Sequence, residues 1–282
     1  MNAIEVSKLT KHYPNFALEK ADIVVPNGYV CGFVGPNGAG KTTALKCMLG
    51  MVRPDGGEVK LLGRDVSDAS VKEDVGVLFD QPYFQEDWKV KDIENALSPF
   101  YRRWSHDDYV KYLKLFELDA AQKFKNFSRG QKMKLGMATI LSRGAKLLLL
   151  DEPTGGLDPV ARDEMLDLMR EYMEDEQRTI LFSTHITSDL EKIADTIIYI
   201  SHGRIAFSGE KDELTERYCV VRGGVGELPR DKRAKAHGYR EHSSGYECLM
   251  DVADIGGLPP GAVTDKAAID DIVVFMERGA LI

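Results

Sequence analysis

The sequence has little of what would mark a secreted, metal-stapled or membrane-spanning protein. Its only cysteines, Cys31, Cys47, Cys219 and Cys248, show no C-x-x-C spacing, so they indicate neither a zinc site nor a disulfide framework and suit a reducing cytosol. No apolar run approaches the length of a membrane span. Residues 2–10 alternate apolar and polar side chains, unlike the apolar block of a signal peptide. Any activity at a membrane would therefore need a second chain that crosses it.

Charge and composition narrow the class further. A net charge of −8 argues against broad, non-specific binding of nucleic acid, and we expect no nucleic-acid partner. Apolar and charged contents of 43% and 29% are those of a soluble globular protein. At 282 residues the chain has room for one large domain, or for one domain with an appendage.

The order of patterns along the chain predicts an α/β fold. Short alternating strands near the N-terminus predict an antiparallel β-subdomain, and the later alternation of strands with helices favours a mostly parallel sheet. Between these parts, residues about 82–141 carry apolar side chains at three- and four-residue spacing, which predicts a helical subdomain with helices over 92–101, 107–117 and 128–141. We predict a main domain over residues 1–217 and a small α+β accessory domain over 218–282.

The stretch Gly35–Thr43 fits the phosphate-binding pattern G-x-x-x-x-G-K-[ST]. A buried strand is expected just before it over 29–34, and a helix just after it over 42–49, which is the context that the pattern requires. The glycines let successive backbone N–H groups point at phosphate oxygens, and the start of the helix adds positive potential. Lys41 is expected to reach the β- and γ-phosphates, and the Thr42 hydroxyl to bind Mg²⁺.

A second pair of functional residues follows four consecutive leucines. The run 147–150 is too short for a membrane helix and fits a strand covered on both faces, which ends at Asp151 and Glu152. An acid at the end of a strand beside a phosphate loop can hold Mg²⁺, directly or through water. The next carboxylate can activate a water molecule, so Glu152 is a candidate general base.

The segment Phe127-Ser128-Arg129-Gly130-Gln131 opens the last of the predicted helices in the helical region. Free N–H groups at a helix start, together with the Ser128 hydroxyl, can bind an anion. Taken by itself, the pattern equally describes an ordinary capped helix with a flexible Arg-Gly turn.

Together these motifs resemble those of the nucleotide-binding subunit of an ATP-binding-cassette (ABC) transporter, over about residues 3–215. The phosphate loop, the segment 127–131 and the leucine strand with its Pro153-Thr154 continuation resemble the family's first phosphate motif, signature and acidic motif. Residues 155–158 resemble the loop that crosses to the partner subunit, and Ser183-Thr184-His185 resembles the switch histidine. The resemblance implies a P-loop NTPase core that binds ATP and Mg²⁺ and hydrolyses ATP.

The resemblance also implies roles for individual residues. Nucleotide contacts are expected from Tyr13, stacking on adenine, and from Asn37, Gly38, Gly40, Lys41, Thr42 and Thr43. Contacts with the nucleotide of the partner are expected from Ser128, Arg129, Gly130 and Gln131, and a dimer contact from Asp158. Catalysis is expected from Glu152 and His185, and metal binding from Thr42 and Asp151.

One position departs from the family pattern. Aligning Val75–Phe79 with the usual strand puts Asp80 where a glutamine normally contacts the metal and water, and Gln81 comes one residue late. Either Asp80 takes over the metal contact, or a small shift brings Gln81 to it. The two alternatives remain open at the level of sequence.

Within the family, the chain resembles bacterial exporter subunits of the bacitracin and antibiotic-response branch. This resemblance implies a homodimer that closes on ATP and drives a separate six-helix permease from the inner, cytoplasmic face of the membrane. The permease contact is expected over 81–88, through Tyr83, Phe84 and Trp88, although core packing explains such aromatic residues equally well.

Three other functions fit parts of the sequence. A soluble ABC-type ATPase in translation or another non-transport process is the main alternative, but the translation factors carry two cassettes where this chain has one. A chromosome-maintenance ATPase would place a long coiled coil between phosphate loop and signature, and residues 44–126 show no sustained heptads. A small-molecule kinase would lack the signature and the switch histidine.

Overall fold

A six-stranded sheet forms the centre of the computed structural model, which describes residues 1–279 and, in the last helix, side chains as far as Glu277. All neighbours run parallel except the edge strand β10, which is antiparallel to β9. The predicted α/β core with a mostly parallel sheet is confirmed. In spatial order the strands are β10 (Arg204–Glu210), β9 (Thr196–Ser201), β3 (Val30–Val34), β8 (Thr179–Thr184), β7 (Leu147–Asp151) and β6 (Val75–Leu78).

The leucine strand β7 is buried at every position, as expected for a strand covered on both faces. Because successive side chains of a strand point to opposite faces, Leu148 and Leu150 join one hydrophobic cluster and Leu147 and Leu149 the other. The first cluster includes α4 (Arg129–Leu141), α5 (Pro159–Tyr172) and α6 (Thr187–Ile193). The second includes α1 (Lys41–Met48).

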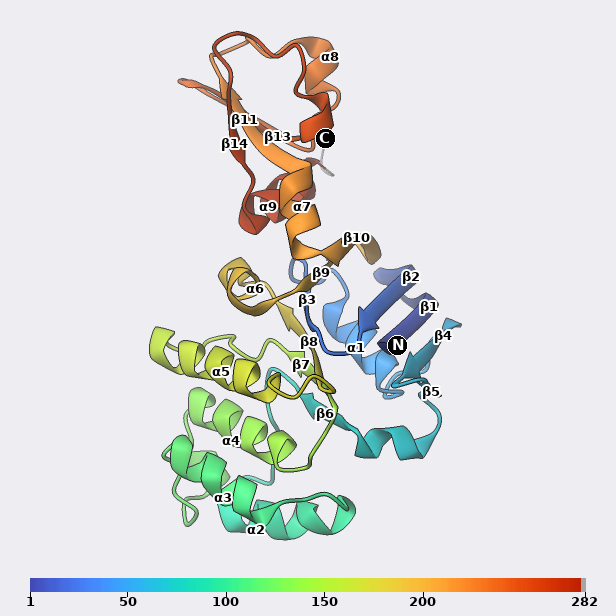
Figure 1. Cartoon of the computed structure of the whole chain (residues 1–282), viewed down its shortest axis with the longest axis vertical. Coiled ribbons are helices and arrows are strands. Elements are labelled where there is room, and N and C mark those ends of the chain that lie inside the picture. Colours follow the sequence, from blue (N-terminus) through green and yellow to red (C-terminus); the bar gives the residue numbers. More distant parts are fainter. Residues whose placement is uncertain (280–282) are drawn as a thin grey trace.

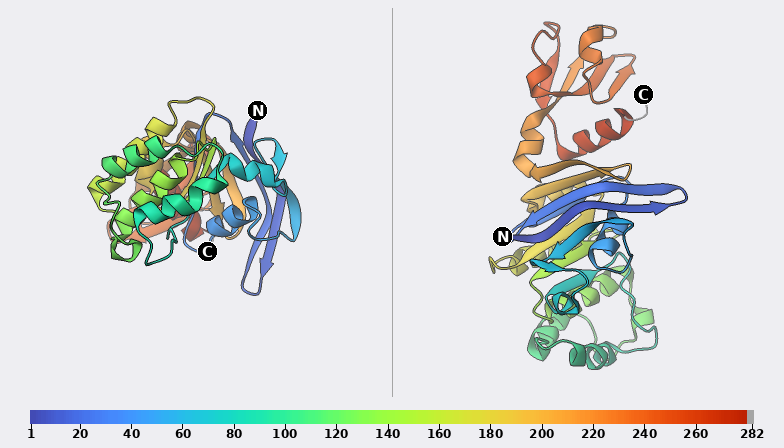
Figure 2. Two further views of the ribbon diagram at one scale, coloured as in Figure 1. Left: turned by 90° about the horizontal axis from the view of Figure 1, so that it is seen from below. Right: turned by 90° about the vertical axis from the view of Figure 1, so that its right-hand side faces the viewer.

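The second sheet is antiparallel and covers α1 from outside, as predicted for the β-subdomain (Figures 1 and 2). Ile4, Leu18 and Ile23 are fully buried and share a hydrophobic cluster with Leu45 and Met48 of α1. In spatial order this sheet consists of β2 (Phe16–Pro26), β1 (Asn2–Tyr13), β4 (Gly56–Leu61) and β5 (Arg64–Asp65).

Helices fill the chain between β6 and β7. The helices expected over 92–101, 107–117 and 128–141 are α2 (Val90–Leu97), α3 (His106–Leu115) and α4. Short 3-10 helices occupy Ser98–Phe100 and Phe124–Asn126, and another, Ala69–Glu73, precedes β6. Among the described residues, no helix is long and apolar enough to cross a membrane.

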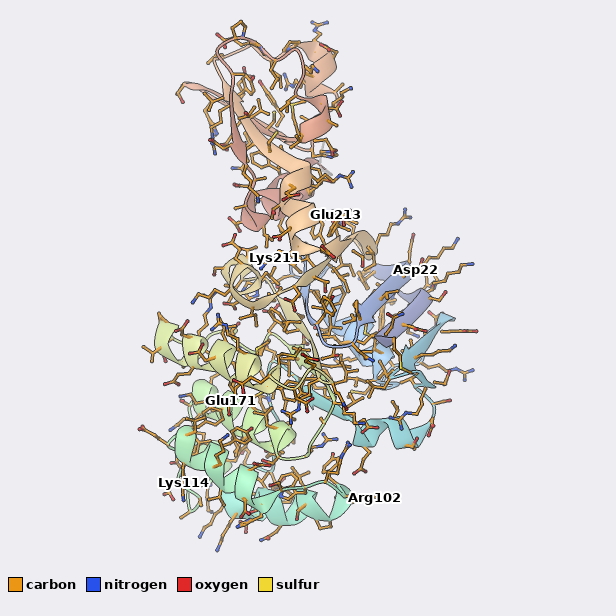
Figure 3. The ribbon with its side chains drawn as sticks, viewed as in Figure 1. Asp22, Arg102, Lys114, Glu171, Lys211 and Glu213 are labelled. Carbon is orange, nitrogen blue, oxygen red and sulfur yellow. The ribbon has the colours of Figure 1, made fainter. Side chains whose placement is uncertain are left out.

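The C-terminal part lies at the opposite end of the molecule from α2 and α3 (Figure 1). Helix α7 (Lys211–Arg217), marked by Lys211 and Glu213 in Figure 3, leads into it from the main sheet. Its antiparallel sheet has the order β12 (Tyr239–His242), β13 (Gly245–Asp251), β11 (Tyr218–Gly223) and β14 (Val263–Lys266). Helices α8 (Arg230–Arg233) and α9 (Ile269–Gly279) and the 3-10 turn Val252–Asp254 complete the predicted α+β appendage.

Candidate functional site

The phosphate loop connects β3 to α1, as the sequence predicts. Gly40, which precedes the helix, has a φ of 112°, and a β-carbon added there would lie 2.7 Å from the Phe16 ring. A β-carbon on Gly35 would lie 2.2 Å from the Ile200 carbonyl oxygen. The loop therefore needs glycine at both ends, and the free N–H groups at the start of α1 add the positive potential that phosphate favours.

Lys41 is buried beneath this loop. Its Nζ donates to the carbonyl oxygens of Gly35 (2.6 Å) and Pro36 (3.3 Å) and lies 3.6 Å from Oε1 of Glu152. Burial lowers the pKa of Lys41, and the carboxylates of Glu152 and Asp151 act in the opposite direction. A cation thus sits between the loop and the acidic strand end, where it can neutralise a phosphate.

Asp151 is held by two hydroxyl groups. Thr42 Oγ1 donates to its Oδ2 at 2.8 Å, and Ser183 Oγ donates to its Oδ1 at 2.5 Å. The pairing register of β7 with β8 puts Ser183 opposite Asp151. Among the described residues, no group of three or more His, Cys, Asp or Glu could hold a metal ion. One carboxylate and one hydroxyl beside a phosphate cradle fit Mg²⁺, which prefers oxygen ligands and takes the rest from phosphates and water.

Glu152 follows in a strained conformation. Its φ is +52°, in the left-handed region, and its N–H donates to the carbonyl oxygen and to Oγ of Ser183, at 3.1 Å each. Its carboxylate, 15% exposed, meets Nδ1 of His185 at 2.8 Å. The structure thus brings Glu152, His185 and Lys41 together at the carboxyl edge of the sheet, where Asp151 also lies.

Ser128 begins α4 as the sequence indicates. Its hydroxyl accepts the Gln131 N–H (3.2 Å), and the Gln131 side-chain oxygen accepts the Ser128 N–H (3.0 Å), which forms a reciprocal capping box. Among the described residues, no hydrogen bond or ion pair joins 128–131 to the phosphate loop. The cap explains the helix start, and Ser128 itself remains exposed.

Of the remaining predicted residues, Tyr13 ends β1, and its ring lies 6.5 Å from that of Phe16, the residue that packs against Gly40. Asp158 caps α5 by accepting hydrogen bonds from the N–H groups of Val160 and Ala161. The pKa of Asp158 is lowered, and the hydrogen bond from Ala161 is the largest cause. The exposed Asn37 and Gly38 lie at the tip of the phosphate loop, and Thr43 lies on α1.

Asp80 follows β6 and forms an ion pair with Arg129, while Gln81 is exposed. Both Asp80 and Gln81 line one cavity of about 400 Å³. Both follow β6, the strand that pairs with β7, and the choice between them as a metal contact stays a prediction.

Sequence reasoning missed the fully buried Asp189 of α6. Its carboxylate accepts hydrogen bonds from Thr154 Oγ1 and from Arg162 Nε, at 2.6 Å each. Thr154 lies two residues after Glu152, and α6 begins two residues after His185. Asp189 therefore joins the segment that follows Glu152 to the helix that follows His185. Its only signal in the sequence is an acid near a helix start, which is too common to be informative.

A strand, a glycine loop and a helix that place Lys41 and Thr42 beside an acidic strand end define a nucleoside-triphosphate-binding P-loop protein. A family model described as "ABC transporter" matches residues 18–155. The lantibiotic transport ATP-binding protein SrtF of Streptococcus pyogenes is 32% identical over 212 residues, which cover 74% of this chain and 91% of SrtF. The chain belongs to the ABC transporter family, and the predicted family is confirmed.

Two other relatives are also named as transport or transporter ATP-binding proteins. The bacitracin transport ATP-binding protein BcrA of Enterococcus faecalis is 32% identical over 76% of this chain and 71% of its own. An uncharacterised ABC transporter ATP-binding protein of Nostoc is 36% identical over 70% of this chain, but the match spans only 61% of that relative. A solved ATP-binding subunit of an ABC transporter superposes with a TM-score of 0.68, at 26% identity over 75% of this chain and 91% of the subunit.

Proposed function

We propose that the chain is the ATP-hydrolysing subunit of an ABC exporter and drives a separate membrane permease. The observation that carries the proposal is the meeting of Lys41, Asp151, Glu152 and His185 at one edge of the sheet. In this proposal the loop N–H groups and Lys41 bind the phosphates of ATP, and Tyr13 stacks on adenine. Thr42 and Asp151 hold Mg²⁺, which neutralises phosphate charge.

Glu152 is the general base in this reaction. Its Oε1 lies near Lys41 and its Oε2 near His185, so the carboxylate is oriented from both sides. A carboxylate so held can accept a proton from the attacking water while His185 fixes its position. The backbone of Glu152 is strained, and such strain persists only where surrounding contacts maintain it. Strain of this kind is common at active sites, which supports a catalytic role for Glu152.

The working unit in this proposal is a homodimer that closes on ATP. Ser128 and Asp158 are exposed, and no hydrogen bond among the described residues joins 128–131 to the chain's own phosphate loop. In this proposal the signature of one subunit serves the nucleotide of the other, as the family resemblance implies. Both subunits keep Glu152 and His185, so both sites are active.

Size-exclusion chromatography of Glu152→Gln, with and without ATP, tests the dimer. Slow hydrolysis should trap the closed form, so ATP should shift the protein to the dimer. Adding Ser128→Arg should abolish the shift by bulk and loss of the cap, whereas Ser243→Arg, in the exposed turn between β12 and β13, serves as a control. A monomer in both conditions, with ATP bound, would show that closure needs the permease or another subunit.

The permease contact is proposed over 81–88. Tyr83 is 84% exposed and Trp88 38% exposed, whereas Phe84 packs edge-on against Phe124 with ring centroids 5.4 Å apart. Tyr83 and Trp88 are therefore the available anchors, and Phe84 supports the helical region from inside. The named relatives serve bacitracin and lantibiotic transport, which supports export.

Co-purification of the native chain from cells tests this assignment. A hydrophobic six-helix permease should accompany the wild-type chain at the inner face of the membrane, and Tyr83→Ser with Trp88→Ser should release it without changing ATP binding. Tyr29→Ser, which alters another exposed tyrosine, is the control. Recovery with ribosomes instead would favour the alternative, a soluble ABC-type ATPase in translation.

A further inference from the structure

The turn between β9 and β10, His202-Gly203, lies against the phosphate loop. The end of β9 pairs in parallel with the end of β3, so the turn and the loop leave the sheet at the same edge. Ile200, fully buried at the end of β9, makes the close approach to Gly35 described above. A β-carbon on Gly40 would also lie 3.4 Å from the Ile200 Cδ1. Both ends of the phosphate loop therefore rest on the end of β9.

One hydrogen bond from this turn fixes a peptide group of the phosphate loop. The Gly203 N–H donates to the Ala39 carbonyl oxygen at 3.1 Å. Because the C=O and N–H of a trans peptide point in opposite directions, a carbonyl held toward the turn directs the Gly40 N–H away from it. Among the described residues, no peptide bond is cis, and no backbone acceptor for the Gly40 N–H occurs. The turn thus sets the direction of an N–H group that is available to a ligand.

The turn adopts a conformation that needs support from its surroundings. His202 has a φ of +46°, which is uncommon for a residue other than glycine and persists only where other contacts maintain it. A β-carbon on Gly203 would lie 1.8 Å from the Ala17 carbonyl oxygen of β2. The Gly203 carbonyl oxygen accepts the Glu19 N–H at 2.8 Å. The antiparallel sheet therefore holds the turn from one side.

Glu277 of α9 contacts the same region from the C-terminal part. Its Oε1 accepts a hydrogen bond from the Tyr199 hydroxyl at 2.7 Å, and its Oε2 lies 3.5 Å from Nε2 of His202. Tyr199 is 2% exposed and the Glu277 side chain 21%, so solvent screens this contact less than it screens a surface pair. The two contacts flank Ile200, the residue that packs against the phosphate loop.

We propose that Glu277 is a positioning residue for the phosphate loop and acts through Tyr199 and the β9–β10 turn. The inference rests on the proposed function, in which the loop N–H groups bind the phosphates of ATP. Loss of the carboxylate would release the turn on one side, and the Ala39–Gly40 peptide group would then sample more orientations. ATP binding would have to restore one of them, so affinity should fall. Substitutions that act on a site through packed contacts have modest effects, and we expect roughly two- to fivefold.

Isothermal titration calorimetry of the full chain, with Mg²⁺ and a non-hydrolysable ATP analogue, tests the inference. Glu277→Ala should raise the dissociation constant roughly two- to fivefold. Glu277→Gln can still accept the Tyr199 hydroxyl and should bind nearly as the wild type does. Asp270→Ala is the matched control, because Asp270 joins the same helix to Thr187 and not to the turn. Equal effects of Glu277→Ala and Asp270→Ala, or no effect of Glu277→Ala, would overturn the inference.

Tyr199→Phe removes the same hydrogen bond from the other partner and carries the test if Glu277→Ala fails to fold. It should weaken binding no more than Glu277→Ala does, and the double substitution should bind as Glu277→Ala does, because both act through one contact. A double substitution whose effect is the product of the two single fold-changes would reject this route. Hydrogen–deuterium exchange of residues 35–43 without nucleotide is a second readout, which Glu277→Ala should raise and Asp270→Ala should not.

Lys41→Ala separates this inference from the proposed function. If the loop binds the phosphates, Lys41→Ala should weaken binding of the analogue far more than Glu277→Ala does. Binding by Lys41→Ala as tight as that of the wild type would reject the proposed phosphate site. Weak binding by Lys41→Ala, together with unchanged binding by Glu277→Ala, would reject the role of Glu277 alone.

Discussion

The carboxyl edge of the central sheet and the C-terminal part are built in different ways. At the edge, polar side chains of neighbouring elements are hydrogen-bonded to one another, as in the contacts of Asp151 with Thr42 and Ser183. In the C-terminal part, the buried residues are mostly apolar, and the ion pairs, such as Arg222–Asp265, lie at the surface. The first arrangement suits chemistry on a charged ligand, and the second suits a part that stabilises the fold.

The two regions nevertheless share one core. Ile272 and Phe275 of α9 belong to the same buried cluster as Leu190 of α6, the helix that begins just after His185. Two hydrogen bonds reinforce the contact, from Thr187 Oγ1 to Asp270 (3.3 Å) and from the Tyr199 hydroxyl to Glu277 (2.7 Å). The C-terminal part can therefore stabilise the segment after the switch histidine without contributing a residue to the site.

The largest effect, on the rate of ATP hydrolysis, is expected at the carboxyl edge of the central sheet. Glu152→Gln should slow ATP hydrolysis by about 10²- to 10⁴-fold, the usual cost of losing a general base, and leave ATP binding intact. Steady-state phosphate release and equilibrium nucleotide binding measure the two quantities. Glu171→Gln, which alters a surface ion pair with Lys111, is the control. Turnover near that of the wild type would remove Glu152 from the reaction.

Phe275→Ala should lower the stability of the fold rather than the catalytic rate, the opposite of Glu152→Gln. Phe275 is 2% exposed, and its loss should lower the free energy of unfolding by about 3–5 kcal/mol while ATP affinity stays the same. Denaturant titration and nucleotide binding test this, and the half-buried Val274→Ala should cost less. A large change in ATP affinity would make the C-terminal part energetically part of the site. Truncation at Arg217 is a blunter test, because it would uncover apolar side chains such as Leu214.

Asp189→Asn tests the helix that the two regions share. The substitution leaves Arg162 without its buried charged partner and should cost about 1–3 kcal/mol of unfolding free energy. Asp163→Asn is a matched control, since Asp163 also joins α5 to α6, through Lys192, but at the surface. The cost of this control substitution should be clearly smaller, because the ion pair is exposed to solvent. Equal costs would mean that burial of Asp189 contributes nothing.

Tyr199→Phe should have the smallest effect, about 0.5–1.5 kcal/mol for one hydrogen bond. Burial, and then the hydrogen bond to Glu277, raise the pKa of Tyr199. The folded state therefore keeps this proton at a pH where the unfolded chain loses it, so the stabilisation is complete below about pH 10 and declines as pH rises above it. The stability difference between wild type and Tyr199→Phe should narrow across that range in urea titrations. A constant difference would contradict the pKa shift.

The parts of the site that sequence determined are those that depend on neighbours in the chain. The spacing of the glycines at 35 and 40 before Lys41 predicts a loop and a helix start. The close approach of Ile200 and Phe16 to these glycines comes from tertiary packing. The capping box of Ser128 and Gln131 likewise needs only a three-residue spacing. Four leucines before Asp151 fit a strand covered on both faces, and β7 is buried at every position.

Tertiary structure decided the contacts between segments far apart in the chain. The approach of Arg129 to Asp80, of Asp189 to Thr154, and of α9 to α6 depends on how helices pack on the sheet, and no spacing in the sequence encodes it. Asp80, for example, is the neighbour of Gln81 in the chain, yet its ion-pair partner Arg129 lies 49 positions away. Local physics thus determined the phosphate-binding chemistry, and packing determined which charges surround it.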